Sequence, residues 1–177
     1  MDAPVAGSKI PAERGELLFL VGGDAEIVER CAPLFEVMGR KTIHVGGNGM
    51  GTSLKMVINL LLGQAMAAFS EGMALGESLG IDQQTLLDIL LASAVVPAFV
   101  AGKRDKISQN QFDPEFPLRW MHKDLHLAAE TAFAQGVSMP LANAAKETYA
   151  LAKQKGLGGN DFSAIYRFLH EREDKIS

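Results

Sequence analysis

Hydrophobic positions along the chain follow two kinds of pattern, and the change comes near residue 50. Residues 17–21 are a short apolar run closed by two glycines, which predicts a buried strand. After Asp24, a favourable N-cap, apolar residues recur at helical spacing over 25–38. Residues 42–45 again have the pattern of a strand. The first part of the chain therefore predicts a strand–helix–strand unit of an α/β sheet.

Beyond Gly51 the strand patterns stop and helical periodicity takes over. The predicted helices cover about 52–79, 82–91, 97–107, 118–135, 140–155 and 161–171, with a proline-containing loop at 112–117. The coarse prediction is a small piece of α/β sheet followed by an all-helical domain. Two strands and one helix cannot cover both faces of a parallel sheet. Either the small unit packs on the helical part as an appendage, or its partners lie on sequence outside this chain.

Length and composition narrow the class of protein. The chain has 177 residues, which suggests one domain or one domain plus a fragment. Charged residues make up 21%, and 17 Lys and Arg against 21 Asp and Glu leave a net charge of −4, so non-specific nucleic-acid binding is disfavoured. The single cysteine, Cys31, excludes an internal disulfide framework and fits a reducing compartment.

Membrane and secretory interpretations are also disfavoured. Polar residues or proline interrupt the most apolar stretches, 60–69 and 89–101, which are shorter than the ~20 apolar residues of a spanning helix. The N-terminus has no basic region followed by an apolar one. We therefore expect a soluble, cytoplasmic protein.

The glycine-rich turn before the long helix resembles a dinucleotide-binding loop only superficially. Residues 47–51 read G-x-G-x-G, and Leu54 stands where the last glycine of G-x-G-x-x-G would be needed. The pattern favours a tight strand-to-helix turn over a primary cofactor loop.

Lys55 and Asn59 are four residues apart on a helix that is otherwise apolar there, so both point from one face. A lysine in such surroundings has a destabilised ammonium form and can act as a proton donor or acceptor near neutral pH. Asn59 could hold that lysine or a substrate oxygen by hydrogen bonding. The alternative is a lysine that extends to solvent at the start of a helix, with a solvated asparagine.

Lys123 and Asp124 form a second candidate set. Adjacent residues on a helix point about 100° apart, so we expect no ion pair between them, and a solvated charged strip is the alternative interpretation. His122 and His126 have the i, i+4 spacing of a metal pair, but no third ligand is evident, so we predict no metal site.

Other polar residues are interpreted as structural. Ser8 lacks the context of a nucleophile elbow, and Cys31 lies on an apolar helix face. Lys103, Arg104 and Lys106 cluster near a predicted helix C-terminus, where cations complement the helix dipole. We therefore assign no chemistry to any of them.

Several of these segments together resemble the β-hydroxyacid dehydrogenase family, which includes 3-hydroxyisobutyrate dehydrogenase and glyoxylate/succinic semialdehyde reductase. The matching segments are residues 2–7 (Asp-Ala-Pro-Val-Ala-Gly), 21–24 (Val-Gly-Gly-Asp), the 49–51 turn into Lys55 and Asn59, 116–125 (Phe-Pro-Leu-Arg-Trp-Met-His-Lys-Asp-Leu) and 161–166 (Asp-Phe-Ser-Ala-Ile-Tyr). The resemblance covers nearly the whole chain. Residues 9–15 and the Phe116 segment look closest to the glyoxylate/succinic semialdehyde reductase branch.

The resemblance implies a mainly α fold: an all-helical, 6-phosphogluconate-dehydrogenase-like C-terminal domain at 49–177, preceded at 1–48 by the last strands of an NAD(P)-binding Rossmann domain. It implies that Lys55 is the acid/base of a carbonyl reduction and that Asn59 orients the substrate. The other implied roles are substrate-carboxylate binding by the backbone of Ala6, Gly7 and Ser8, lining of the site by Phe116, cofactor contact by Lys123 and catalysis by Asp124.

The chain departs from the family at two points. Ala6 stands where the family usually has serine, so one hydroxyl contact to substrate is missing, and Ser8 is a candidate replacement. The glycine fingerprint and first strands of the Rossmann portion are absent, so the main site for NADP or NAD is expected outside this chain. The fragment alone is expected to bind dinucleotide weakly and to be inactive.

Three functions remain open at this stage. The leading hypothesis is part of an NAD(P)-dependent hydroxyacid dehydrogenase or aldehyde-acid reductase that acts on a small carboxylate and forms a homodimer or tetramer through the helical domain. The rival is a non-catalytic helical oligomerisation module, because the family also contains a nuclear relative that works as a tetrameric scaffold. A Schiff-base enzyme that uses Lys55 is disfavoured, since no phosphate-binding loop accompanies it.

Overall fold

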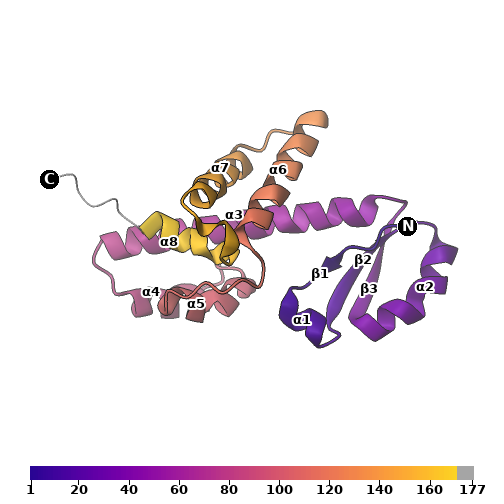
Figure 1. Cartoon of the computed structure of the whole chain (residues 1–177), viewed down its shortest axis with the longest axis horizontal. Helices are drawn as coiled ribbons and strands as arrows, with labels where there is room; N and C mark the ends of the chain where they lie inside the picture. The colour runs from indigo at the N-terminus through magenta and orange to yellow at the C-terminus, as the bar shows by residue number, and fades with distance from the viewer. Residues whose placement is uncertain (171–177) are drawn as a thin grey trace. The chain divides into compact units, whose positions relative to one another are not determined.

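The computed structural model describes residues 1–170 and divides the chain into two compact units, Met1–Asn59 and Leu60–Ser177. The long helix α3 (Met50–Ser78) contributes residues to both units (Figure 1). The sequence analysis placed a domain boundary after residue 48, between the last strands of a nucleotide-binding domain and a helical domain. That assignment stays a prediction.

The first unit is a three-stranded sheet with a helix across it. The strands β1 (Val5–Ala6), β2 (Leu17–Gly22) and β3 (Gly39–Gly46) lie in that order, with β1 antiparallel to β2 and β2 parallel to β3. Helix α1 (Lys9–Glu13) connects β1 to β2, and α2 (Ala25–Met38) connects the two parallel strands (Figure 1). This is the predicted strand–helix–strand unit, with one short antiparallel strand added at its edge.

Local sequence explains why α2 begins and packs where it does. The Asp24 side chain accepts hydrogen bonds from the backbone N–H groups of Glu26 (3.0 Å) and Ile27 (3.3 Å) and so caps the helix. Phe35 of α2 packs on Phe19 of β2 with ring centroids 4.7 Å apart. This apolar contact fixes α2 on one face of the sheet.

The second unit is helical. Besides most of α3 it contains α4 (Gln83–Ala92), a 3₁₀ turn η1 (Ala98–Lys103) that runs into α5 (Arg104–Ser108), α6 (Leu118–Ala134), α7 (Pro140–Gln154), the 3₁₀ turns η2 (Leu157–Gly159) and η3 (Phe162–Ala164), and α8 (Ile165–His170). Helices α6 and α7 pack against each other along their length (Figure 1). The mainly α fold class is confirmed.

The core of this unit is built around the middle of α3. Met66 and Met73 on α3 are fully buried, as are Met121 on α6 and Tyr149 on α7. Helices α3 and α6 approach closely at Gly63, where an added Cβ would lie 2.7 Å from the Met121 sulfur. By length and composition α3 could also cross a membrane, with a mean hydropathy of 1.3 in its most apolar window, but core helices of soluble proteins meet the same criteria.

Four elements differ from the sequence prediction. The sequence did not predict β1 and α1, because two and five residues are too short for periodicity to show. The predicted helix over 97–107 is a 3₁₀ turn followed by a short α-helix. The predicted helix over 161–171 begins as a 3₁₀ turn and becomes α8 only at Ile165, and residue 171 lies outside the described residues.

Candidate active site

The predicted carboxylate-binding residues follow the first strand. Ala6 ends β1, Gly7 has a φ of 128°, and Ser8 precedes α1 without a side-chain cap. An added Cβ at Gly7 would also press on Leu17 and Pro11, at 3.0 and 3.1 Å, so the bend there needs glycine. The bend exposes Gly7 at the start of a turn, which suits backbone donation to an anion, and that role stays a prediction.

The turn that leads to Lys55 is held by a carboxylate from the chain's own N-terminal segment. Asp2 Oδ1 accepts a hydrogen bond from Gly49 N at 2.6 Å, while its Oδ2 accepts from Thr52 N at 2.6 Å and from Thr52 Oγ1 at 2.8 Å. The backbone bonds from Gly49 and Thr52 lower the pKa of the Asp2 carboxyl below its ordinary value of 3.8. Asp2 therefore fills the anion position at the N-terminus of α3 that a cofactor phosphate would need.

Lys55 and Asn59 lie one turn apart on α3, shortly after this cap. Asn59 is only 6% exposed and Lys55 is half-buried, and each interacts with other groups of the protein. A buried amide beside a partly buried ammonium group is an arrangement that can hold and protonate a small oxyanion.

Lys123 and Asp124 form an ion pair, so the prediction that adjacent helical residues would not pair is wrong. Lys123 Nζ lies 2.6 Å from Asp124 Oδ1 on α6. Their Cβ atoms do diverge by about 100°, but the four-carbon lysine side chain is long enough to fold back across that angle. The Asp124 side chain is 15% exposed and that of Lys123 is 49% exposed, so Lys123 still presents a cation to solvent.

The two histidines of α6 lie next to each other without a third candidate metal ligand among the described residues. The rings of His122 and His126 stack with centroids 6.5 Å apart, and within residues 1–170 no group of three or more His, Cys, Asp or Glu side chains is placed to hold a metal ion. Burial, together with the Lys153 ammonium 3.2 Å from Nδ1, lowers the pKa of His122 below its ordinary value of 6.5. Its neighbours therefore favour the neutral imidazole.

Phe116 is fixed by residues that the sequence analysis did not assign to the site. Its ring packs edge-on against Phe162 with centroids 5.9 Å apart, and its backbone N–H donates to Asp161 Oδ2 at 3.3 Å. Lys103, interpreted from sequence as one of several cations that complement a helix dipole, is 7% exposed and lies 3.1 Å from Asp161 Oδ2. No local pattern could have shown this pair, since its members are 58 residues apart in sequence.

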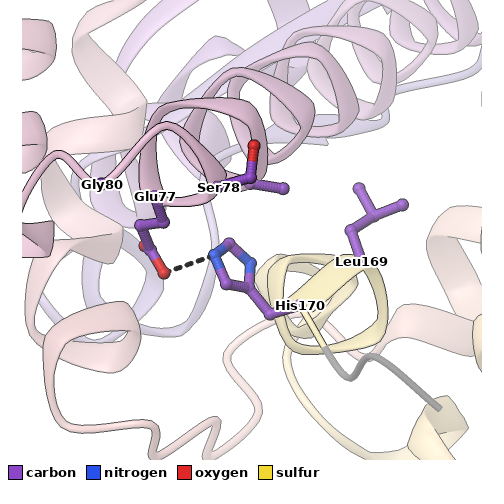
Figure 2. Close-up of a pocket in the computed structure, with 6 residues that line it drawn as sticks. Glu77, Ser78, Gly80, Leu169 and His170 are labelled. Atoms are coloured by element: carbon purple, nitrogen blue, oxygen red, sulfur yellow. Dashed lines mark ion pairs between the residues drawn. The ribbon is translucent and has the colours of Figure 1, made fainter. Parts of the chain in front are cut away.

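A pocket of about 380 Å³ lies elsewhere, between the end of α3 and α8, and it is lined by none of the predicted site residues. Figure 2 shows His170 directed at Glu77, with Nε2 and Oε2 2.7 Å apart. Tyr166 OH donates to the other oxygen of Glu77 at 2.8 Å, and burial raises the pKa of Tyr166 to about 12. These contacts fasten α8 to α3, so we interpret the cluster as structural.

The predicted site residues lie in different units of the chain. Ala6, Gly7, Ser8, Lys55 and Asn59 belong to the first unit, and Phe116, Lys123 and Asp124 to the second. That the two sets form one site stays a prediction.

Comparison with known proteins identifies relatives for both parts of the chain. Residues 49–169 match the NAD-binding family of NADP-dependent 3-hydroxyisobutyrate dehydrogenase, and residues 1–46 match the NAD-binding domain of 6-phosphogluconate dehydrogenase. The chain is 39% identical over 165 residues to glyoxylate/succinic semialdehyde reductase 1 of Arabidopsis thaliana, covering 93% of this chain and 57% of the reductase.

Two further similarities matter for function. The chain is 36% identical over 171 residues to the human cytokine-like nuclear factor N-PAC, covering 96% of this chain and 31% of that protein. It also resembles a structure of Mycobacterium tuberculosis 3-hydroxyisobutyrate dehydrogenase with L-serine, at 33% identity and a TM-score of 0.84, covering 95% of this chain and 60% of that one. The chain therefore spans 31% to 60% of the length of these relatives.

Proposed function

This chain belongs to the 3-hydroxyisobutyrate dehydrogenase family, and on that premise we propose that it is the C-terminal part of an oxidoreductase that interconverts a short-chain hydroxyacid and its aldehyde or keto acid. The cofactor is NAD or NADP. We propose glyoxylate or succinic semialdehyde as the type of substrate, because the chain is similar to a reductase named for both. In this proposal residues 1–48 are the end of the nucleotide-binding domain and 49–177 are the helical domain.

The observation that carries the proposal is the pairing of half-buried Lys55 with buried Asn59 on one face of α3. Hydride for the carbonyl carbon would come from the reduced nicotinamide. Lys55 then gives its proton to the carbonyl oxygen as negative charge develops there, and takes it back in the oxidation direction. Asn59 donates a hydrogen bond that orients the substrate, and its burial keeps that amide in place.

The remaining predicted residues bind the two reactants. The backbone at Ala6, Gly7 and Ser8 holds the substrate carboxylate. Phe116 forms an apolar wall, and Asp124 acts in catalysis as the partner of Lys123. The exposed Lys123 ammonium fits a contact with the cofactor, whereas the glycine turn at the start of α3 does not fit its phosphates, because Asp2 already accepts those N–H bonds.

The test is an assay of the complete gene product with NADPH and either aldehyde-acid, following the loss of NADPH absorbance. Lys55→Ala is expected to lower kcat by at least about 100-fold, and Asn59→Ala to raise the substrate KM. Lys41→Ala, which removes an exposed lysine from β3, serves as the matched control and should leave both constants unchanged. Full activity in Lys55→Ala would refute the assigned mechanism.

A second candidate is a non-catalytic helical assembly module, and it is kept because the chain is also similar to a protein named as a nuclear factor rather than as an oxidoreductase. The two candidates differ in what the complete gene product does with NADPH. Calorimetric binding and turnover support the enzyme, whereas a stable oligomer without either supports the module. For the 177 residues alone we expect no tight NADPH binding.

We further propose a soluble, cytoplasmic homodimer or tetramer assembled through the helical domain. Large apolar side chains such as Leu61, Leu75 and Ile89 are more than 60% exposed on the helices, which suits burial against a second copy. A monomeric sedimentation profile of the complete gene product would contradict this.

A further inference from the structure

Lys103 and Asp161 form a buried ion pair that the proposed reaction does not use. Asp161 is 0% exposed and Lys103 is 7% exposed. Lys103 Nζ also lies 3.0 Å from Glu115 Oε2 and 5.1 Å from the centre of the Phe162 ring. The free-energy cost of removing two charges from water offsets most of their mutual attraction, so a buried ion pair contributes little to stability by itself. Its position in the fold suggests another role.

The two carboxylate oxygens of Asp161 have separate partners. Oδ1 accepts hydrogen bonds from Ser163 N at 3.2 Å and from Ser163 Oγ at 2.7 Å, which orients the carboxylate on its own turn. Oδ2 accepts from Glu115 N at 3.1 Å and from Phe116 N at 3.3 Å, and it also contacts Lys103. One carboxylate oxygen therefore binds the backbone on which Phe116 is carried.

Two further contacts hold Phe116 against the same turn. The Phe116 carbonyl accepts a hydrogen bond from Phe162 N at 2.9 Å, and the two phenyl rings meet edge to face. Earlier in the same segment, the Phe112 carbonyl accepts a hydrogen bond from Asp161 N at 2.9 Å. Pro117, which follows Phe116, has no N–H group to donate and is the N-cap of α6. The segment before α6 thus takes its backbone position from the Asp161 turn.

We propose that Asp161, paired with Lys103, is a positioning residue for the substrate site: it fixes the backbone and ring of Phe116 and so sets the wall against which a short carboxylate substrate binds. Asp161 does not touch the substrate and transfers no proton. This inference rests on the proposed function, since it takes Phe116 as a lining residue.

Kinetics of the complete gene product give the first test. Asp161→Asn keeps the size of the side chain but leaves only one acceptor oxygen, so the bonds from Ser163 N and from Phe116 N cannot both be kept. We expect the KM for the aldehyde-acid to rise about tenfold, with a smaller change in kcat and none in the KM for NADPH. A loss of folded protein alone would lower kcat without raising KM. Asp113→Asn, an exposed aspartate in the same segment, is the matched control and should leave all three constants unchanged.

A milder variant covers the case in which Asp161→Asn does not fold. Ser163→Ala removes the 2.7 Å bond to Oδ1 and loosens the carboxylate without removing it. We expect a KM increase of about threefold. An unchanged KM in Asp161→Asn, or in Ser163→Ala where the first variant is insoluble, overturns the proposal.

Hydrogen exchange on the 177-residue chain separates this inference from the proposed function. The amides of Glu115 and Phe116 should exchange at least about tenfold faster in Asp161→Asn than in the parent chain or in Asp113→Asn. Hydrogen exchange needs no enzymatic activity. It therefore still tests whether Asp161 fixes the Phe116 backbone, even if the complete gene product reduces no aldehyde-acid. Unchanged exchange refutes the positioning, and faster exchange with an unchanged KM refutes its link to the substrate.

Discussion

Gly51→Ala should distort the start of α3 and with it the position of Lys55. Gly51 is the second residue of α3 and is buried where the end of β2 meets the glycine turn. An added Cβ would lie 3.0 Å from Gly22 N and would overlap the Leu20 carbonyl oxygen, well inside the 3.0 Å limit below which real Cβ contacts are essentially never found. These two atoms belong to the backbone, and the third atom in the way, Asp2 Oδ2 at 3.0 Å, is held by its hydrogen bonds from Thr52, so no side-chain rotation relieves the overlap.

The cost follows from that geometry. Overpacking a close contact costs about 1–3 kcal/mol when the surroundings can give way, and a fixed backbone carbonyl places this variant at the upper end. The greater helix propensity of alanine returns up to about 1 kcal/mol. We therefore expect a net loss of about 2 kcal/mol in the free energy of unfolding, or a drop of roughly 4–8 °C in Tm.

Gly47→Ala is the matched control, because Gly47 lies in the same turn and an added Cβ there meets nothing within 4 Å. Thermal unfolding followed by circular dichroism compares the two variants, and hydrogen exchange over residues 17–22 and 50–59 locates the change. In the complete gene product, a shift of about 1 Å at Lys55 should also cost on the order of 100-fold in kcat/KM. Equal stability of the two variants, within about 0.5 kcal/mol, would refute the reasoning.

Three further predictions follow from individual side chains. Burial alone would raise the pKa of Asp161, but Lys103 and the Ser163 hydrogen bonds outweigh it and lower the pKa below 3.8. The ionised Asp161 carboxylate therefore stabilises the fold above pH 3.8, and this stabilisation is lost as the pH falls further. On acid titration in urea, the free energy of unfolding of Asp161→Asn should therefore fall less than that of the parent chain. Ala6→Ser should lower the substrate KM of the complete gene product by up to about tenfold, because it restores a hydroxyl that can bond the carboxylate, and an unchanged KM would show that Ser8 already supplies it. Lys123→Ala should cost less than about 1 kcal/mol in urea unfolding, since its ion pair is half exposed, yet raise the KM for NADPH.

Elements with strong local signals could be predicted from sequence, and those fixed by distant contacts could not. Asp24 before an apolar helical repeat predicted the start of α2, and the side-chain cap is present. The period of the apolar residues likewise predicted α3, α6 and α7 to within a few residues. Strand β1 has two residues and depends on its pairing with β2, so nothing within it could indicate a strand.

The polar residues show the same division more sharply. Lys103 could not be distinguished from its neighbours Arg104 and Lys106, because its burial depends on Asp161 far along the chain. The ion pair of Lys123 with Asp124 depends on a side-chain rotamer, which helical spacing does not determine. Sequence spacing indicates which face a residue occupies, whereas only the fold indicates which charge it meets.

The glycine-rich turn before α3 resembles a cofactor-binding loop, but Asp2 gives it a structural role. A parallel strand, a glycine-rich turn and a helix N-terminus together form an anion site, and β3, residues 47–51 and α3 have that arrangement. Because the Asp2 carboxylate occupies the site, the N–H groups of Gly49 and Thr52 cannot hold a phosphate or a substrate carboxylate. Under the proposed function, the anionic end of the substrate would then be bound by other donors, and within the first unit the bend at Gly7 is the predicted group that remains exposed. The same carboxylate that excludes a ligand from the helix N-terminus also holds the first turn of α3, and so places Lys55 on a fixed element.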